Sequence, residues 1–157
     1  MIKDYVVGYC FSPLQLAVAL IKKNKPEWQQ GKLNGVGGKV EPLESPQHAM
    51  AREFYEEAGV LIPISRWLHI RTEEFAPDQE ATRGLTDYAR VFHFGVIARS
   101  DEWLNIHTTT DEQIVIMPYP LAGLSHYDQD RLIYNLPYLI PMAAILLQQP
   151  PENRPLP

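Results

Sequence analysis

Apolar and β-branched residues gather in short runs separated by glycine, proline and polar clusters, a pattern typical of β-strands. The first two runs, Asp4–Phe11 and Gln15–Lys22, are joined at Ser12-Pro13 and predict a hairpin. Ala76–Thr86 is a polar segment between two later runs, which predicts an antiparallel pair across it. The later candidate strands are Leu33–Val40, Ile64–Phe75, Tyr88–Ala98 and Glu112–Met117.

One segment between the strands has clear helix boundaries. Ser45 is a favourable N-cap, Pro46 suits the first helical position, and Gly59 suits the left-handed position after a helix. These signals predict a helix over Pro46–Ala58.

A second helix is predicted over Asp130–Gln149, where apolar residues recur near helical spacing. Pro137 and Pro141 are expected to kink or split it. The order of elements predicts an α/β fold in one domain over residues 1–149, with a mixed sheet between helices. Residues 150–157 are rich in proline and are expected to be a disordered tail.

Composition narrows the class of protein. The 157 residues suit one domain, and the net charge of −5, without a basic patch among aromatics, argues against binding a nucleic acid polymer. The single Cys10 excludes an internal disulfide. We expect a cytoplasmic protein without a signal peptide or a membrane span, because no apolar run reaches about 18 residues.

The predicted helix Pro46–Ala58 carries a cluster of carboxylates. Glu53, Glu56 and Glu57 are spaced i, i+3 and i+4, so they share one face. Mg²⁺, or Mn²⁺ in its place, would neutralise their repulsion, and the crowding should raise the pKa of at least one, as suits a general base. The alternative is a solvated acidic face on which Arg52 pairs with Glu56.

A glycine-rich loop before this helix completes a longer pattern with the spacing G-x5-E-x7-R-E-U-x-E-E-x-G-U, where U is aliphatic or aromatic. Its members are Gly38, Glu44, Arg52, Glu53, Phe54, Glu56, Glu57, Gly59 and Val60. This pattern resembles the Nudix box, the signature of the MutT-type hydrolases of nucleoside diphosphates linked to another moiety.

The resemblance implies an α/β/α sandwich and a Mg²⁺-dependent attack of water on a phosphorus of a pyrophosphate. It further implies that the metal is held by the Gly38 carbonyl with Glu53, Glu56 and Glu57. Glu53 and Glu57 would be catalytic, and Arg52 would orient a catalytic glutamate.

The segment Leu33–Val40 is similar to the W-N-G-F-G-G-K-V segment of the eukaryotic MutT homologues that remove oxidised purine triphosphates. The resemblance implies that Asn34 hydrogen-bonds a purine, whereas Leu33 replaces the usual tryptophan. The alternative role for Asn34 is a turn before glycine. We therefore expect a purine nucleoside triphosphate, oxidised forms included, to be hydrolysed to the monophosphate and pyrophosphate.

Other candidates have two interpretations each. Lys39 either neutralises phosphate charge or faces solvent, and Trp28 either stacks on a base or covers the sheet edge. Glu44 belongs to the motif, while Asp111 and Glu112 are either a late base-contacting or catalytic acid or ordinary loop charge.

Two alternative functions remain at this stage. One is an ADP-ribose or nucleotide-sugar pyrophosphatase. The other is a non-catalytic nucleotide-binding module. The three crowded glutamates argue against it, because a binding module has no need of them. The expected partner is a small nucleotide, and the protein is expected to be a monomer or a homodimer.

Overall fold

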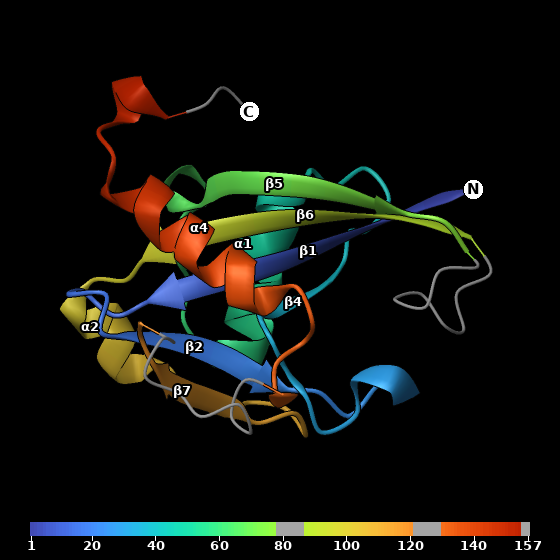
Figure 1. Cartoon of the computed structure of the whole chain (residues 1–157), viewed down its shortest axis with the longest axis horizontal. Helices are drawn as coiled ribbons and strands as arrows, with labels where there is room; N and C mark the ends of the chain where they lie inside the picture. Colours follow the sequence, from blue (N-terminus) through green and yellow to red (C-terminus); the bar gives the residue numbers. More distant parts are fainter. Residues whose placement is uncertain (78–86, 121–129, 155–157) are drawn as a thin grey trace.

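The computed structural model describes residues 1–77, 87–120 and 130–154. A mixed sheet lies between helices, as Figure 1 shows. The strands are β1 (Ile2–Phe11), β2 (Ala17–Lys22), β3 (Leu33–Asn34), β4 (Val36–Lys39), β5 (Leu68–Phe75), β6 (Tyr88–Ile97) and β7 (Ile114–Pro118). The helices are α1 (Pro46–Ala58), α2 (Ser100–Asn105) and α4 (Leu136–Gln148), and short 3₁₀ turns span Glu27–Gln29, Ile64–Arg66 and Pro151–Asn153.

Strand β1 is the middle of the sheet. It runs parallel to β6 along its whole length, while its middle, from Tyr5 to Gly8, pairs antiparallel with β4 and its end pairs antiparallel with β2. Val7 therefore lies between Gly37 of β4 and His93 of β6. This register places the glycine-rich loop and the middle of β6 on opposite sides of one strand.

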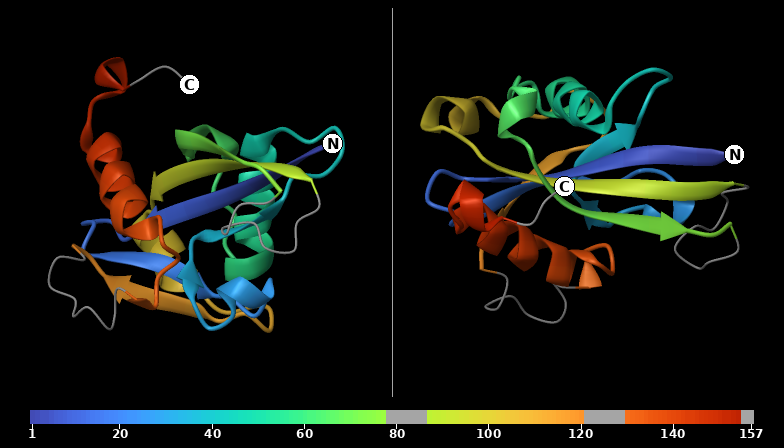
Figure 2. Two further views of the ribbon diagram at one scale, coloured as in Figure 1. Left: turned by 45° about the vertical axis from the view of Figure 1, so that its right-hand side comes forward. Right: turned by 90° about the horizontal axis from the view of Figure 1, so that it is seen from above.

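The helices cover both faces of the sheet. Helices α1 and α2 lie on one face and α4 on the other, as the view from above in Figure 2 shows. Because side chains alternate along a strand, Val6 and Cys10 of β1 pack with α1, whereas Tyr9 and Phe11 pack with α4. The predicted α/β/α sandwich is confirmed.

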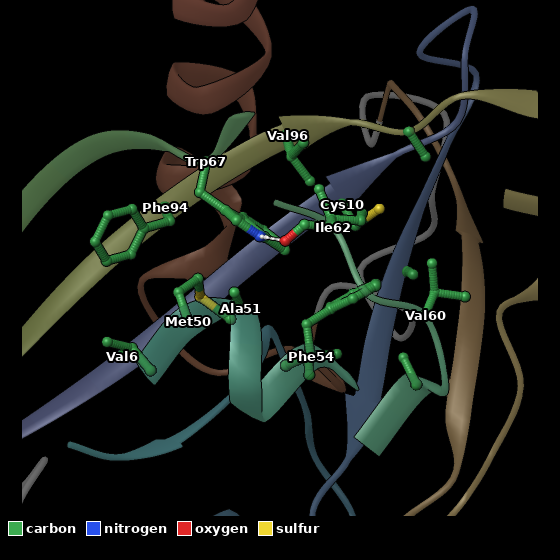
Figure 3. Packing of buried hydrophobic residues seen from close by; sticks show 14 of the residues in the cluster. Val6, Cys10, Met50, Ala51, Phe54, Val60, Ile62, Trp67, Phe94 and Val96 are labelled. Carbon is green, nitrogen blue, oxygen red and sulfur yellow. Dashed lines mark hydrogen bonds between the residues drawn. The ribbon is translucent and has the colours of Figure 1, made fainter. Parts of the chain in front are cut away.

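The core under α1 is built from large apolar side chains (Figure 3). Met50 and Phe54 of the helix pack against Trp67, whose ring stands edge-on to Phe54 at a centroid distance of 5.3 Å. The buried indole N–H of Trp67 donates to the Ile62 carbonyl at 3.2 Å, so this donor is paired although it is buried. This packing fixes the helix that carries the carboxylates.

Both predicted boundaries of α1 are confirmed. The Ser45 hydroxyl accepts a hydrogen bond from the His48 N–H at 3.3 Å, and Pro46 is the first helical residue. Gly59 has φ +75°, a left-handed conformation that glycine adopts without strain, and its N–H donates to the Tyr55 carbonyl.

The second helix is shorter than predicted. It begins at Leu136, because the residues before it bond to β3: the Leu33 N–H donates to the Arg131 carbonyl and the Ile133 N–H to the Leu33 carbonyl. The prolines were predicted to kink or split it; they do not split it, and a kink stays a prediction. Pro137 lies in the first turn, where no N–H partner is needed, and α4 continues through Pro141.

Smaller differences lie at the ends of other elements. Ile64–Arg66 forms a 3₁₀ turn after Pro63, so β5 starts at Leu68, and Ser100–Asn105 forms the short helix α2. Pro151–Asn153 forms a 3₁₀ turn, while residues 155–157 and most of the predicted loop 76–86 lie outside the described residues. Disorder of the tail 150–157 stays a prediction.

Candidate active site

The Arg52 guanidinium joins the loop before α1 to the helix itself. It forms paired bonds to Glu44, from Nε to Oε1 at 2.8 Å and from Nη2 to Oε2 at 2.9 Å. Nη2 also donates to the Lys39 carbonyl at 3.0 Å, and Nη1 donates to Glu53 at 2.8 Å and to Glu56 at 3.2 Å. The bond from Arg52 is the main cause that lowers the pKa of Glu44. Arg52 thereby fixes the glycine loop against the carboxylates.

Glu53 and Glu57 are the half-buried carboxylates of this face, whereas Glu56 is exposed. Burial raises the pKa of both, and that of Glu57 reaches about 7, with repulsion from Glu53 adding to it and Lys23 opposing it. Oε2 of Glu57 is buried without a hydrogen-bond partner. Glu57 therefore has the protonation range of a general base near neutral pH.

Gly38 brings the loop backbone close to these carboxylates. A Cβ atom at Gly38 would lie 2.5 Å from the Glu53 carboxyl group, so any larger residue would require that carboxyl group to move. The Gly37 backbone lies close enough to the Glu57 carboxylate to oppose the rise of its pKa. Loop and helix thus form one site rather than two neighbouring features.

A cavity of about 190 Å³ opens beside the glycine loop. Gly37 and Gly38 line one side of it, and His93 and Asn135 line the side across β1. Trp28 and Asn34, two of the predicted substrate-binding residues, also line it.

The Asn34 amide is partly engaged by its neighbours. Its Oδ1 accepts from the Gly35 N–H at 2.8 Å, and its Nδ2 donates to Gln29 Oε1 at 3.2 Å. These two bonds use one Nδ2 hydrogen and one Oδ1 lone pair, so a second hydrogen and a second lone pair of the amide remain for a ligand. Both interpretations of Asn34, turn residue and base reader, therefore fit its position.

The remaining candidates, Lys39, Asp111 and Glu112, differ in burial and in the residues that they contact. The Lys39 side chain is exposed and does not line the cavity, whereas Lys23, which sequence reasoning missed, does. Lys23 Nζ pairs with the buried Glu112 at 3.0 Å, and Asp111 is exposed beside Asn24. The one signal for Lys23 is its position directly after an apolar strand.

A protein-family model described as NUDIX domain matches residues 7–128. The chain belongs to the Nudix family. Its predicted resemblance is confirmed, and the chain is a Nudix hydrolase. No curated protein matches the chain.

Solved Nudix structures share the fold at low identity. A MutT structure from work on Aliivibrio salmonicida and Vibrio cholerae has a TM-score of 0.61 and 19% identity, covering 90% of this chain and 96% of its own. The Nudix domain of Shewanella oneidensis NrtR, complexed with ADP ribose, has a TM-score of 0.64 and 15% identity, covering 92% and 88%. A bifunctional NMN adenylyltransferase/ADP ribose pyrophosphatase from Francisella tularensis, complexed with AMP and a Mn ion, has a TM-score of 0.64 and 14% identity, covering 94% and 42%.

Nudix hydrolases use divalent metals, and the residues at this loop fit such an ion. Oε2 of Glu57 is a buried oxygen without a partner, and the Glu53 carboxylate is packed against Gly38. No three His, Cys, Asp or Glu side chains of the described segments form a ready metal cage, and Glu56 is 53% exposed and paired with Arg52. This arrangement suits Mg²⁺, which takes few protein carboxylates and completes its shell with water and substrate phosphates.

The described helices hold no segment that is long and apolar enough to span a bilayer. The site residues gather in one region: the Arg52 cluster and the half-buried glutamates by the glycine loop, and Asn34 and Trp28 around the adjoining cavity.

Proposed function

We propose that this Nudix hydrolase cleaves the pyrophosphate of a purine nucleoside triphosphate, oxidised forms included, to give the monophosphate and pyrophosphate. The half-buried Glu57 carboxylate carries the proposal, because its buried Oε2 has no hydrogen-bond partner and it lies beside the glycine loop that lines the cavity. Supporting residues are Asn34 and Trp28 in the cavity wall.

The residues divide the work as follows. Gly38, Glu53, Glu56 and Glu57 would hold Mg²⁺, or Mn²⁺, through the Gly38 carbonyl and the carboxylates. When bound, the metal supplies positive charge to the phosphates and acidifies a water. We assign to Glu57 the role of taking the proton of the attacking water.

Arg52 keeps Glu53 in place through its bond at 2.8 Å, and Glu44 holds Arg52. Lys23 offers a cation in the cavity wall for the phosphates, the role that was predicted for Lys39. We also propose that the protein acts in the cytoplasm on free nucleotides, as a monomer or a homodimer.

The second candidate is ADP-ribose or a nucleotide sugar. It is favoured by two structural neighbours, one complexed with ADP ribose and one named an ADP ribose pyrophosphatase. Both candidates contain a pyrophosphate, so the roles of the glutamates are the same in each.

The first test combines a substrate screen with a charge-neutral variant. Purified protein with Mg²⁺ is assayed on nucleoside triphosphates, oxidised purine triphosphates, ADP-ribose and nucleotide sugars. We expect Glu57→Gln to lower kcat by at least about 100-fold, as loss of a catalytic charge does. Glu74→Gln, an exposed glutamate on β5, is the matched control and should keep kcat within about twofold. Full activity in excess EDTA, or an unimpaired Glu57→Gln protein, would contradict the proposal.

A further inference from the structure

A buried polar cluster lies on the side of the cavity opposite the glycine loop, outside the Nudix box. Its centre is Glu73 of β5, whose side chain is 10% exposed. Tyr138 Oη donates to Glu73 Oε1 at 2.6 Å, and Asn135 Nδ2 donates to Glu73 Oε2 at 3.1 Å. His93 Nε2 lies 3.5 Å from the same Oε2. Glu73 is therefore an acceptor surrounded by donors.

Asn135 is held in one orientation by this carboxylate. A carboxylate accepts but does not donate, so only the NH₂ group of the amide can face Glu73. The carbonyl Oδ1 must then point elsewhere, and it is buried without a hydrogen-bond partner. Asn135 is 6% exposed and lines the cavity.

His93 supports the same arrangement. It is 2% exposed and lines the cavity, and its Nδ1 lies 2.9 Å from the buried Tyr9 hydroxyl. If the hydroxyl donates to Nδ1, the hydrogen of the neutral ring is on Nε2, toward Glu73. Nε2 faces Glu73 Oε2 at 3.5 Å, a contact longer than a normal hydrogen bond, so its nearest partner is the carboxylate.

We propose that this side of the cavity selects a nucleobase that carries an exocyclic amino group, with Asn135 Oδ1 accepting the N–H and Glu73 positioning Asn135. A buried acceptor without a partner favours a ligand that donates, and the negative charge of Glu73 behind it favours the same. A carbonyl in place of the amino group would face the Asn135 oxygen with lone pair against lone pair.

The strand register supports the placement of the base. Val7 of β1 separates Gly37 from His93, so a ligand whose phosphates lie at the glycine loop would extend across β1 toward Asn135. This inference rests on the proposed nucleotide substrate, and it adds which base edge is read.

We test this inference by measuring nucleotide binding rather than turnover, because binding can be measured even if the proposed reaction is wrong. The Glu57→Gln protein is titrated calorimetrically with three pairs of monophosphates: AMP and IMP, GMP and IMP, CMP and UMP. We expect the amino member of at least one pair to bind at least about tenfold more tightly than its partner without that amino group. A ratio below about threefold in every pair, or no binding of any nucleotide, would overturn the inference.

Two further substitutions, each made in the Glu57→Gln protein, test whether Asn135 and Glu73 cause the difference in affinity within a pair. Asn135→Leu removes the acceptor at similar volume and should bring the ratio close to one. In Glu73→Gln the new amide can donate to Asn135 Oδ1, so Asn135 can turn its NH₂ toward the cavity, and the ratio should vanish or invert. Glu74→Gln should keep it. A ratio unchanged in Asn135→Leu contradicts the inference even if Glu73→Gln does not fold. Preserved selectivity without hydrolysis by the wild type would contradict only the proposed function.

Discussion

At the residue scale, Asn34 has two roles that its contacts do not separate. Its amide supports the turn through Gly35 and also lines the cavity. We expect Asn34→Ala to lower kcat/KM for the preferred purine triphosphate by roughly ten- to a hundredfold, as loss of a specificity contact does. Steady-state kinetics and thermal melts measure the two roles separately. A lower Tm with an unchanged kcat/KM would leave only the turn role, and Mg²⁺ affinity should be unaffected in either case.

Glu73 makes a second residue-scale prediction, on pH. The His93 ring beside it and the bonds from Tyr138 and Asn135 lower its pKa to about 2. A carboxyl with a depressed folded-state pKa stabilises the fold above its unfolded value near 4.5, and that stability is lost as the pH falls from 4.5 toward 2. Glu73→Gln should therefore cost about 1–3 kcal/mol at pH 7.

The difference in unfolding free energy between wild type and Glu73→Gln should shrink as the pH falls from 4.5 toward 2. Urea unfolding at a series of pH values from 7 to 3 measures it, with the exposed Glu74→Gln as the control that should show no such convergence. A difference that is constant with pH would mean that Glu73 is not ionised in the fold.

At the element scale, Arg52 of α1 has two unequal partners, Glu44 in the loop before the helix and Glu56 within it. Glu44 is 15% exposed and bonds to two guanidinium nitrogens, whereas Glu56 is 53% exposed and bonds to one. In EDTA we expect Glu44→Gln to lower the unfolding free energy by about 1–3 kcal/mol. Glu56→Gln should leave it within about 0.5 kcal/mol or raise it, because exposed pairs contribute little.

Urea unfolding in EDTA measures the unfolding free energies of Glu44→Gln and Glu56→Gln. Repeating the measurement with Mg²⁺ gives the stabilisation by the metal. That stabilisation should be weaker in Glu56→Gln than in wild type. A large loss of stability in metal-free Glu56→Gln would show that Glu56 is a structural partner of Arg52 instead.

The two long helices show why some elements could be predicted from sequence and others could not. Every signal for α1 is local: Ser45, Pro46 and Gly59 set its ends within a few residues. The start of α4 depends instead on bonds from Arg131 and Ile133 to Leu33, roughly a hundred residues earlier. Periodicity cannot report a competing partner that is so distant in sequence.

The same distinction applies to the site. The Nudix box could be predicted because its residues follow one another in a single loop and helix. The cavity could not, because Lys23, His93 and Asn135 meet only through the sheet and the placement of α4. Each of them has an unremarkable sequence context, and the burial that distinguishes His93 and Asn135 arises only from tertiary packing.

At the scale of the whole molecule, β1 links the proposed metal site to the nucleotide cavity. Gly37 and Gly38 pair with one edge of β1 and line the cavity, while Glu53 and Glu57 approach the same glycines from α1. The cavity and the half-buried Glu53 and Glu57 thus share one short segment of backbone. A nucleotide in the cavity would bring its phosphates to the ion and replace waters in its shell.

Metal and nucleotide should therefore bind cooperatively, each raising the affinity for the other by the same factor. We expect Mg²⁺ and a non-hydrolysable α,β-methylene triphosphate together to raise Tm by more than the sum of their separate shifts. For a chain of this size a coupling of 1 kcal/mol corresponds to about 2–4 °C. In Glu57→Gln the excess should disappear, while Glu74→Gln should retain it. Strictly additive shifts in the wild-type protein would mean that the cavity and the carboxylates of α1 do not serve one ligand.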